Sequence, residues 1–348
     1  MKTPDGAIAV TFTGTAREYF GIWIVNLALS IATLGIWSAW AKVRNRAYIL
    51  GNTSIDGRPF GYHARGLQVL LARLVVVAFL AGAYVVSLVS PVVSGIVGVL
   101  FLLAMPWLIN RGLRFNAVMT SWSTVRFGFR GSYWPGLVVF VVYPFLSIVS
   151  LGLFLPYATR ATKRYTIGGH RLGVSDFTFT SGMAPFWFAF FQVVACIVAG
   201  ILVLVAIGAA GIAIFSGQME FPPAHSAWMT VVLLVALFAL FPFSMLYAAF
   251  LRNAIYAGTA LENGHRFHSA ISPALYVWII VSNAAAVACS LGMLLPWARI
   301  RMARYLCART WLIPAGSLDD IIDEARSRET AVGDAWMDLD GIDVGAAV

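Results

Sequence analysis

Long apolar blocks separated by short polar segments dominate the chain. Hydrophobic runs of about 18 or more residues with few charges are typical of membrane segments. Met1–Glu18 is polar and lacks the apolar region of a cleavable signal peptide, so we expect the first block to direct insertion. Seven blocks stand out: Phe20–Trp40, Leu67–Ser90, Val92–Ile109, Tyr133–Tyr157, Pro185–Phe215, Ala227–Phe250 and Pro273–Trp297.

Short segments between these blocks predict β-hairpins. Thr53–Tyr62, Thr120–Phe129 and Thr259–Phe267 each place a turn with Gly or Ser between two β-branched or aromatic runs, and Thr166–Phe177 is a looser relative. The predicted fold class is therefore an α-helical polytopic membrane protein with internal repeats and small cytoplasmic β-hairpins between the membrane segments.

A sequence motif occurs three times, at residues 33–48, 150–165 and 290–305. Each copy has Ser or Thr followed by Leu-Gly, an aromatic residue five positions after the glycine, and a tyrosine thirteen positions after it. Such self-similarity indicates a repeated structural unit. The shared positions are Gly35, Trp40, Tyr48, Gly152, Tyr157, Tyr165, Gly292, Trp297 and Tyr305.

The residue types of this motif suit a membrane surface. Trp and Tyr favour the headgroup layer, and the Arg and Lys residues that follow suit a helix on anionic lipid. The glycine permits either close helix packing or a bend near the interface. We interpret the nine motif positions as anchors that hold helix ends, with a ligand site as the alternative.

Charge divides the chain into two regions. Residues 1–316 carry 22 Lys and Arg against 6 Asp and Glu, whereas residues 317–348 carry 2 against 9. We predict a membrane domain over 1–316 and an acidic tail over 317–348 that is exposed and forms at most one short helix. Basic residues cluster at the ends of apolar blocks, so membrane lipids, and not nucleic acid, are the expected partners.

Charge also conflicts with seven simple membrane crossings, because strongly basic loops would then face both sides. An alternative lets the second and third blocks form one full hairpin and the fifth and sixth another, while segments 20–40, 133–157 and 273–297 enter and return on the same side. Asn26, Tyr143-Pro144 and Ser282-Asn283 are the predicted breaks. Both termini and all β-hairpins would then be cytoplasmic, where the strands could join in one sheet.

Candidate chemistry is sparse. His265 and His268 form a pair with spacing that a metal site could use, but such a site needs three or four ligands, so membrane-surface residues are the expectation. Ionisable residues within the blocks are nearly limited to Arg73, which can reach the interface. We find no paired intramembrane carboxylates and no nucleotide or hydrolase motif. We therefore expect no enzyme activity, no catalytic residues, no cofactor and no metal.

The combination of Phe12-Thr-Gly14, the Leu-Gly run from Thr33 and the hairpin Thr53–Tyr62 resembles one family, the YjgN-like bacterial inner-membrane proteins, a domain of unknown function. The likeness covers about residues 8–312. It implies a multi-pass protein of the bacterial inner membrane without naming a reaction. Some relatives are encoded near membrane metallopeptidases, which implies another inner-membrane protein as a partner.

Three functions follow from these observations. The first is a repeat-built transporter or conduit for a small molecule, ion or lipid, because repeats commonly flank a pathway in transporters. The second is a non-catalytic scaffold or accessory subunit of another membrane protein such as a membrane peptidase. A lipid-modifying enzyme is the third. A polar lumen would favour the conduit, and a solid core with an exposed apolar patch would favour the scaffold.

Overall fold

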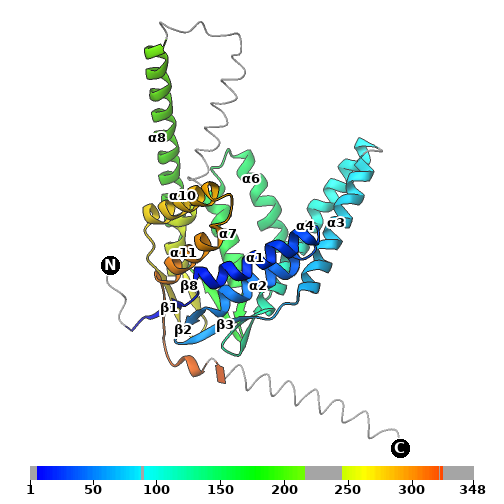
Figure 1. Cartoon of the computed structure of the whole chain (residues 1–348), viewed down its shortest axis with the longest axis vertical. Helices are drawn as coiled ribbons and strands as arrows, with labels where there is room; N and C mark the ends of the chain where they lie inside the picture. The colour runs from blue at the N-terminus through cyan, green and yellow to red at the C-terminus, as the bar shows by residue number, and fades with distance from the viewer. Residues whose placement is uncertain (1–5, 88–89, 216–244, 321, 324–348) are drawn as a thin grey trace, which may run out of the picture.

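Ten short strands alternate with pairs of helices along the chain (Figure 1). The computed structural model describes residues 6–87, 90–215, 245–320 and 322–323. The strands are β1 (Ile8–Phe12), β2 (Thr53–Ile55), β3 (Arg58–Tyr62), β4 (Thr120–Trp122), β5 (Val125–Phe129), β6 (His170–Leu172), β7 (Ser175–Phe179), β8 (Thr259–Leu261), β9 (Arg266–Ser269) and β10 (Thr310–Ile313).

The helices differ in length between successive pairs. The first, third and fifth pairs are short, whereas α3, α4 and α8 are long. The helices are α1 (Ala16–Ala32), α2 (Ser38–Gly51), α3 (Gly66–Ser87), α4 (Pro91–Val118), α5 (Tyr133–Leu137) with the π-helix η1 (Val138–Val142) and α6 (Tyr143–Val149), α7 (Leu155–Gly168), α8 (Ala184–Phe215), a helical stretch over 245–257, α10 (Pro273–Cys289) and α11 (Leu295–Cys307).

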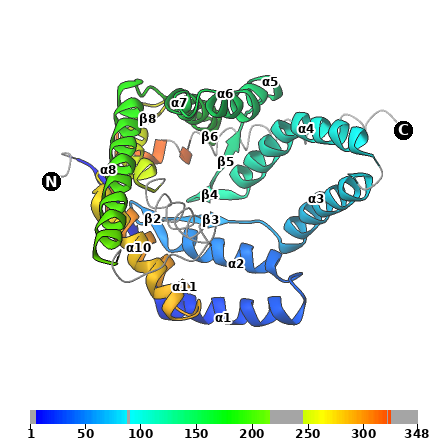
Figure 2. The same ribbon diagram turned by 90° about the horizontal axis from the view of Figure 1, so that it is seen from above.

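The strands form one closed antiparallel barrel in the order β1-β10-β9-β8-β7-β6-β5-β4-β3-β2. β1 closes it by pairing with β10 on one side, through Ile8 and Leu312, and with β2 on the other. The turns between β2 and β3, β4 and β5, β6 and β7, and β8 and β9 therefore share one end of the barrel. The helices leave from the opposite end and fan out around it (Figure 2).

This barrel corrects the predicted fold class of a helical polytopic protein with small separate hairpins. The hairpins expected at Thr53–Tyr62, Thr120–Phe129 and Thr259–Phe267 do form; β6 lies within the looser relative, and β7 begins within it and ends two residues after it. Each strand is only three to five residues long. Strands this short bury few groups alone, and closure removes the unpaired edges that isolated hairpins would expose.

Apolar side chains from all around the barrel form one cluster in its interior. Phenylalanines at matching positions of every second strand, β3, β5, β7 and β9, lie side by side, with ring centroids 6.3, 6.3 and 6.0 Å apart for Phe60–Phe127, Phe127–Phe177 and Phe177–Phe267. The strands between them, together with β10, place Trp122, Leu172, Leu261 and Leu312 directly opposite these phenylalanines. Ile55 of β2 belongs to the same buried cluster. The interior is thus an apolar core, as in other small barrels, with a cavity of about 180 Å³ between its side chains.

The long helices account for the strongest hydrophobic blocks. Among the described residues, three helices are long and apolar enough to cross a membrane: Gly66–Val86, Val92–Val118 and Ala184–Leu202. Tyr133–Val149 and Pro273–Cys289 are apolar but shorter. The seven predicted blocks are therefore not seven equivalent spans. Most of the predicted block Ala227–Phe250 lies outside the described residues.

The reversals in the three short pairs do not lie at the predicted breaks. α1 runs through Asn26, and α10 runs through Ser282 and Asn283. Tyr143-Pro144 lies where the π-helix passes into α6. The chain turns instead at the Leu-Gly pairs, because a helix ends where two successive residues take positive φ.

The first turn of the predicted acidic tail contacts the barrel core. Leu318 and Ile322 are each 6% exposed and belong to the same apolar cluster as the interior side chains. Upstream, the Ala315 N–H donates to His265 Nδ1 at 3.2 Å. The turn lies at the end of the barrel away from the helices (Figure 1). The remaining tail residues, from 324 onward, lie outside the described residues.

We expect the stability of this contact to fall as the pH is lowered. Burial lowers the pKa of His265 below its ordinary value of 6.5, and the charge of Asp320 partly opposes this. The unfolded chain then binds a proton more readily than the folded chain, so acidification below about pH 6.5 destabilises the fold. Thermal unfolding at pH 7 and pH 5.5 should show this loss, and His265→Gln should reduce it. His268→Gln, on the outside of the barrel, is the matched control; equal pH dependence in both variants would contradict the assignment.

Candidate functional site

The Leu-Gly pairs form the tips of the three short helical pairs. Gly35, Gly152 and Gly292 have φ of +92°, +89° and +91°, which favours glycine, and their N–H groups donate to the residue five positions earlier. A Cβ at any of them would meet no heavy atom of the described residues within 4 Å. The glycines therefore permit a bend, and the close-packing alternative is wrong.

The leucine before each glycine also has positive φ, between 49° and 51°, which is unfavourable for a bulky residue. Leu34, Leu151 and Leu291 are each 94% exposed. These leucine side chains bury almost no surface against the rest of the protein. Insertion of the side chain into lipid would provide the missing apolar environment.

The second helix of each short pair, α2, α7 or α11, is its returning helix. The motif aromatics five positions after the glycine lie in the first turn of this helix. The Trp40 ring lies against the backbone of Gly66, at the start of α3. Tyr157 meets Tyr143 edge-on at 5.4 Å, and the Trp297 ring carries the guanidinium of Arg301 at 5.1 Å. Tyr157 and Trp297 remain about 40% exposed, which agrees with an interfacial position.

The motif tyrosines tie the end of each returning helix to the start of the helix before it. The Thr15 N–H donates to the Tyr48 hydroxyl at 2.9 Å, and the Ser272 N–H donates to the Tyr305 hydroxyl at 3.1 Å. The Tyr165 hydroxyl donates to the Ser132 carbonyl at 2.8 Å. Thr15, Ser132 and Ser272 are the N-cap residues of α1, α5 and α10, so each tyrosine closes its helical pair.

Two buried asparagines hold the first and fifth pairs together. The Arg44 guanidinium donates to Asn26 Oδ1 at 3.3 Å, and the Arg301 guanidinium donates to Asn283 Oδ1 at 2.9 Å. In both cases the asparagine lies nine residues before the glycine and the arginine nine residues after it. This symmetric spacing was visible in the sequence and would have predicted the contact.

A large cavity lies between α2 and α11, two helices distant in sequence. It has a volume of about 660 Å³. Lys42, Arg46 and Arg299 line it together with Ser38, Asn45 and apolar side chains. The Arg46 guanidinium donates to Asn116 Oδ1 at 2.5 Å and lies over the Tyr62 ring, and the Arg299 guanidinium donates to the Tyr19 hydroxyl at 2.9 Å. These partners are neutral, so they leave the positive charge uncompensated.

No carboxylate lines this cavity among the described residues. The ion pairs among the described residues join Arg58 and Arg130 to acids at the turn end of the barrel. None involves the cations of the returning helices α2, α7 and α11. These nine are Lys42, Arg44, Arg46, Arg160, Lys163, Arg164, Arg299, Arg301 and Arg304.

The predicted histidine pair is divided between the inside and the outside of the barrel. His265 is buried and bonds to the Ala315 backbone, whereas His268 stacks beside Trp311, with ring centroids 5.9 Å apart. The described residues contain no group of three or more His, Cys, Asp and Glu that could hold a metal ion. Arg73, the ionisable residue of the second block, donates to Ser38 Oγ at 2.6 Å.

Comparison with known proteins agrees with a membrane location. A family model described as bacterial protein of unknown function (DUF898) matches residues 7–339. The chain is 26% identical over 368 residues to inner membrane protein YjgN of Salmonella typhimurium strain LT2, covering 90% of this chain and 89% of that protein. It is 33% identical over 154 residues to inner membrane protein YjgN of Escherichia coli O157:H7, covering 43% of this chain and 38% of that protein. No solved structure matches. The chain therefore belongs to the DUF898 family, and its inner-membrane relatives confirm the YjgN-like resemblance and support the same location for it.

Proposed function

We propose that this protein binds anionic phospholipid in the cavity between α2 and α11 and acts as a lipid conduit of the inner membrane, without catalysing a reaction. The observation that carries the proposal is the uncompensated charge of Lys42, Arg46 and Arg299, with no carboxylate among the lining residues. Clustered cations near a membrane attract anionic headgroups, each contributing about 1 kcal/mol.

The surroundings of the cavity favour lipid over an ion or a polar solute. The helical pairs that form it end in the exposed leucines Leu34 and Leu291, which suit the hydrocarbon layer. The barrel interior is filled with apolar side chains and offers a polar cargo few favourable contacts. We infer that the cargo moves along the surface between helical pairs and that repetition of these pairs around the barrel provides that surface.

A scaffold role is the second candidate, and two observations expected for it favour it: the apolar barrel core and the exposed apolar hairpin of α3 and α4. Only 6% of the apolar windows in these two helices is buried within the chain. A helix that is apolar on all sides can contact lipid or another membrane protein. Binding of a neighbouring membrane protein to α3 and α4, with no lipid preference at the cavity, would favour this alternative.

Neutralising the cavity should remove the preference for anionic lipid. We expect the triple variant Lys42→Gln, Arg46→Gln, Arg299→Gln to bind phosphatidylglycerol about a hundredfold more weakly, because three contributions of about 1 kcal/mol are lost. Native mass spectrometry of the full chain, titrated with phosphatidylglycerol or with phosphatidylethanolamine, measures this.

The matched control removes three exposed cations on or next to the barrel strands, Arg126→Gln, Arg130→Gln and Arg266→Gln, and so has the same net charge. It should keep the lipid preference. Thermal unfolding identifies any loss of fold, since Arg46 also bonds to Asn116. An equal loss of binding in both triple variants would show that only total charge matters and would contradict a site at the cavity.

A further inference from the structure

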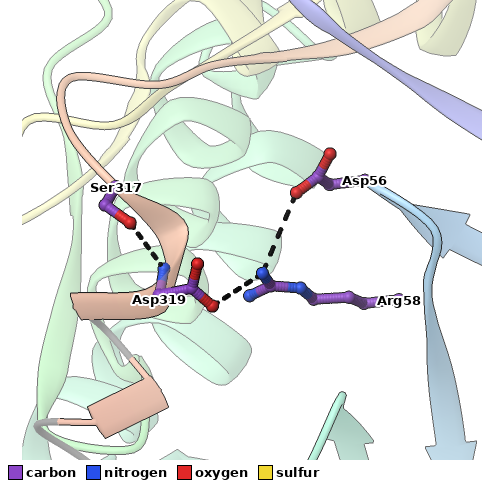
Figure 3. Close-up of polar contacts among 4 residues, drawn as sticks. All are labelled: Asp56, Arg58, Ser317 and Asp319. Atoms are coloured by element: carbon purple, nitrogen blue, oxygen red, sulfur yellow. Dashed lines mark hydrogen bonds and ion pairs between the residues drawn. The ribbon is translucent and has the colours of Figure 1, made fainter.

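A short turn of the chain closes the end of the barrel away from the helices. Leu318 and Ile322 enter the apolar cluster of the barrel, and the Asp319 N–H donates to Ser317 Oγ at 3.1 Å, which begins the turn (Figure 3). The turn thus places the aliphatic side chain of Leu318 and the carboxylate of Asp319 at this open end of the barrel, its mouth.

The carboxylate of this turn meets one arginine at the rim. Asp319 Oδ1 lies 2.7 Å from Arg58 Nη2, and Asp56 Oδ2 lies 4.0 Å from the same nitrogen (Figure 3). The other terminal nitrogen, Arg58 Nη1, is buried without a hydrogen-bond partner among the described residues. Asp319 therefore contacts only one of the two terminal nitrogens of Arg58. A guanidinium can bind both oxygens of a carboxylate at once.

A second donor beside this arginine is also unused. The indole N–H of Trp122 is buried without a partner in the described part of the chain, and the residue is only 3% exposed. The Arg58 guanidinium lies over the Trp122 ring, 5.9 Å from its centroid. Buried donors are normally satisfied, so unused donors on two residues in contact, Arg58 and Trp122, indicate a place for an acceptor such as a carboxylate.

An apolar cavity lies directly behind these groups. It has a volume of about 180 Å³ and is lined by Leu318, Trp122, His265 and interior side chains of the strands, four of them phenylalanines. Apolar cavities of comparable size stay dry and accept small apolar molecules. The mouth therefore combines an arginine at the rim and a buried indole donor with an apolar pocket inside.

We propose that the mouth of the barrel is a binding site for an aliphatic monocarboxylate, and that Leu318 and Asp319 occupy it as an intramolecular competitor. The carboxylate of the ligand would bind Arg58 and the Trp122 N–H, and its alkyl chain would fill the cavity. Because the turn is covalently attached to β10, its effective concentration at the mouth is high. A free ligand therefore binds only when the contacts of the turn are weakened.

Octanoate is the probe for this site. The full chain is placed in phosphatidylcholine nanodiscs, and saturable binding of radiolabelled octanoate is measured by equilibrium dialysis against empty nanodiscs. We expect Asp319→Asn, and more strongly Leu318→Ser with Asp319→Asn and Ile322→Ser, to raise the affinity about tenfold or more, with one site per chain. Adding Arg58→Gln should abolish saturable binding, whereas adding Arg126→Gln, an exposed arginine of β5, should not.

Thermal unfolding shows which variants are folded, and Asp319→Asn alone keeps both apolar side chains of the turn. Octanol, which lacks the carboxylate, should bind at least tenfold more weakly than octanoate. The proposal is overturned if the folded triple variant has no saturable octanoate site or if Arg58→Gln leaves binding unchanged. It is also overturned if a synthetic peptide of residues 315–325 binds the triple variant while octanoate does not, since the mouth would then be a peptide-docking site.

Discussion

Replacing Trp122 with alanine should lower the free energy of unfolding by about 3–5 kcal/mol, the usual cost of truncating a large buried aromatic. Trp122 is 3% exposed and is the largest buried side chain of the apolar cluster inside the barrel. Its removal would leave a void next to the existing cavity of about 180 Å³, which it already lines. Neighbouring strands cannot move inward to fill the void without breaking the closed ladder of hydrogen bonds.

Chemical denaturation of the full chain in detergent, followed by circular dichroism, measures this effect. Trp134→Ala is the matched control, because Trp134 is 73% exposed at the start of α5 and should change the stability little. Similar losses for both substitutions would show that the barrel interior is not the stabilising core. Unchanged stability of Trp122→Ala would lead to the same conclusion.

Local structure was readable from the sequence, whereas the closure of the barrel was not. The turn residues Asp56-Gly57 between two β-rich runs predicted a hairpin, and β2 and β3 form there. Pairing of Ile8 with Leu312 joins residues that are 304 positions apart, and no periodicity within a five-residue strand specifies its partner. The matching positions of Phe60, Phe127, Phe177 and Phe267 were a usable signal that these strands face one interior.

The motif shows the same division between local and long-range information. The helix bend at Gly35 depends on the local backbone, and the glycine predicted it as one of two alternatives. The cavity between α2 and α11 depends on barrel closure, which brings the first and last helical pairs side by side, as the contact between Arg299 and Tyr19 shows. The cations of the returning helices were correctly placed on helices, but their convergence could not be inferred from spacing.

The closed barrel has a further consequence for membrane topology. All of its hairpin turns lie at one end, and a ten-stranded barrel cannot be divided by a bilayer because each strand is bonded to both neighbours. Every helical pair must then leave and return on the same side. Seven single crossings would place the β8–β9 turn opposite the β2–β3 turn, which the pairing of the strands forbids.

We therefore expect cysteines in three different hairpin turns to be labelled from the same side of the membrane. Asp56→Cys, Val174→Cys and Asn263→Cys place single thiols in the β2–β3, β6–β7 and β8–β9 turns, in a chain whose natural Cys196, Cys289 and Cys307 are replaced by serine. A membrane-impermeant maleimide added to intact cells should leave all three unlabelled, because the excess of Lys and Arg at the helix ends predicts a cytoplasmic barrel. After lysis, all three should react.

This experiment tests separately on which side of the membrane the hairpin turns lie and whether the strands pair in one closed barrel. If all three thiols react in intact cells, the orientation is reversed but the barrel still lies on one side. If Val174→Cys or Asn263→Cys reacts while Asp56→Cys is protected, the hairpin turns lie on opposite sides, and the closed barrel is wrong. Leu151→Cys, at the tip of the third helical pair, completes the set: a side chain inserted in the hydrocarbon layer should react slowly from either side, since the maleimide and the thiolate both require water.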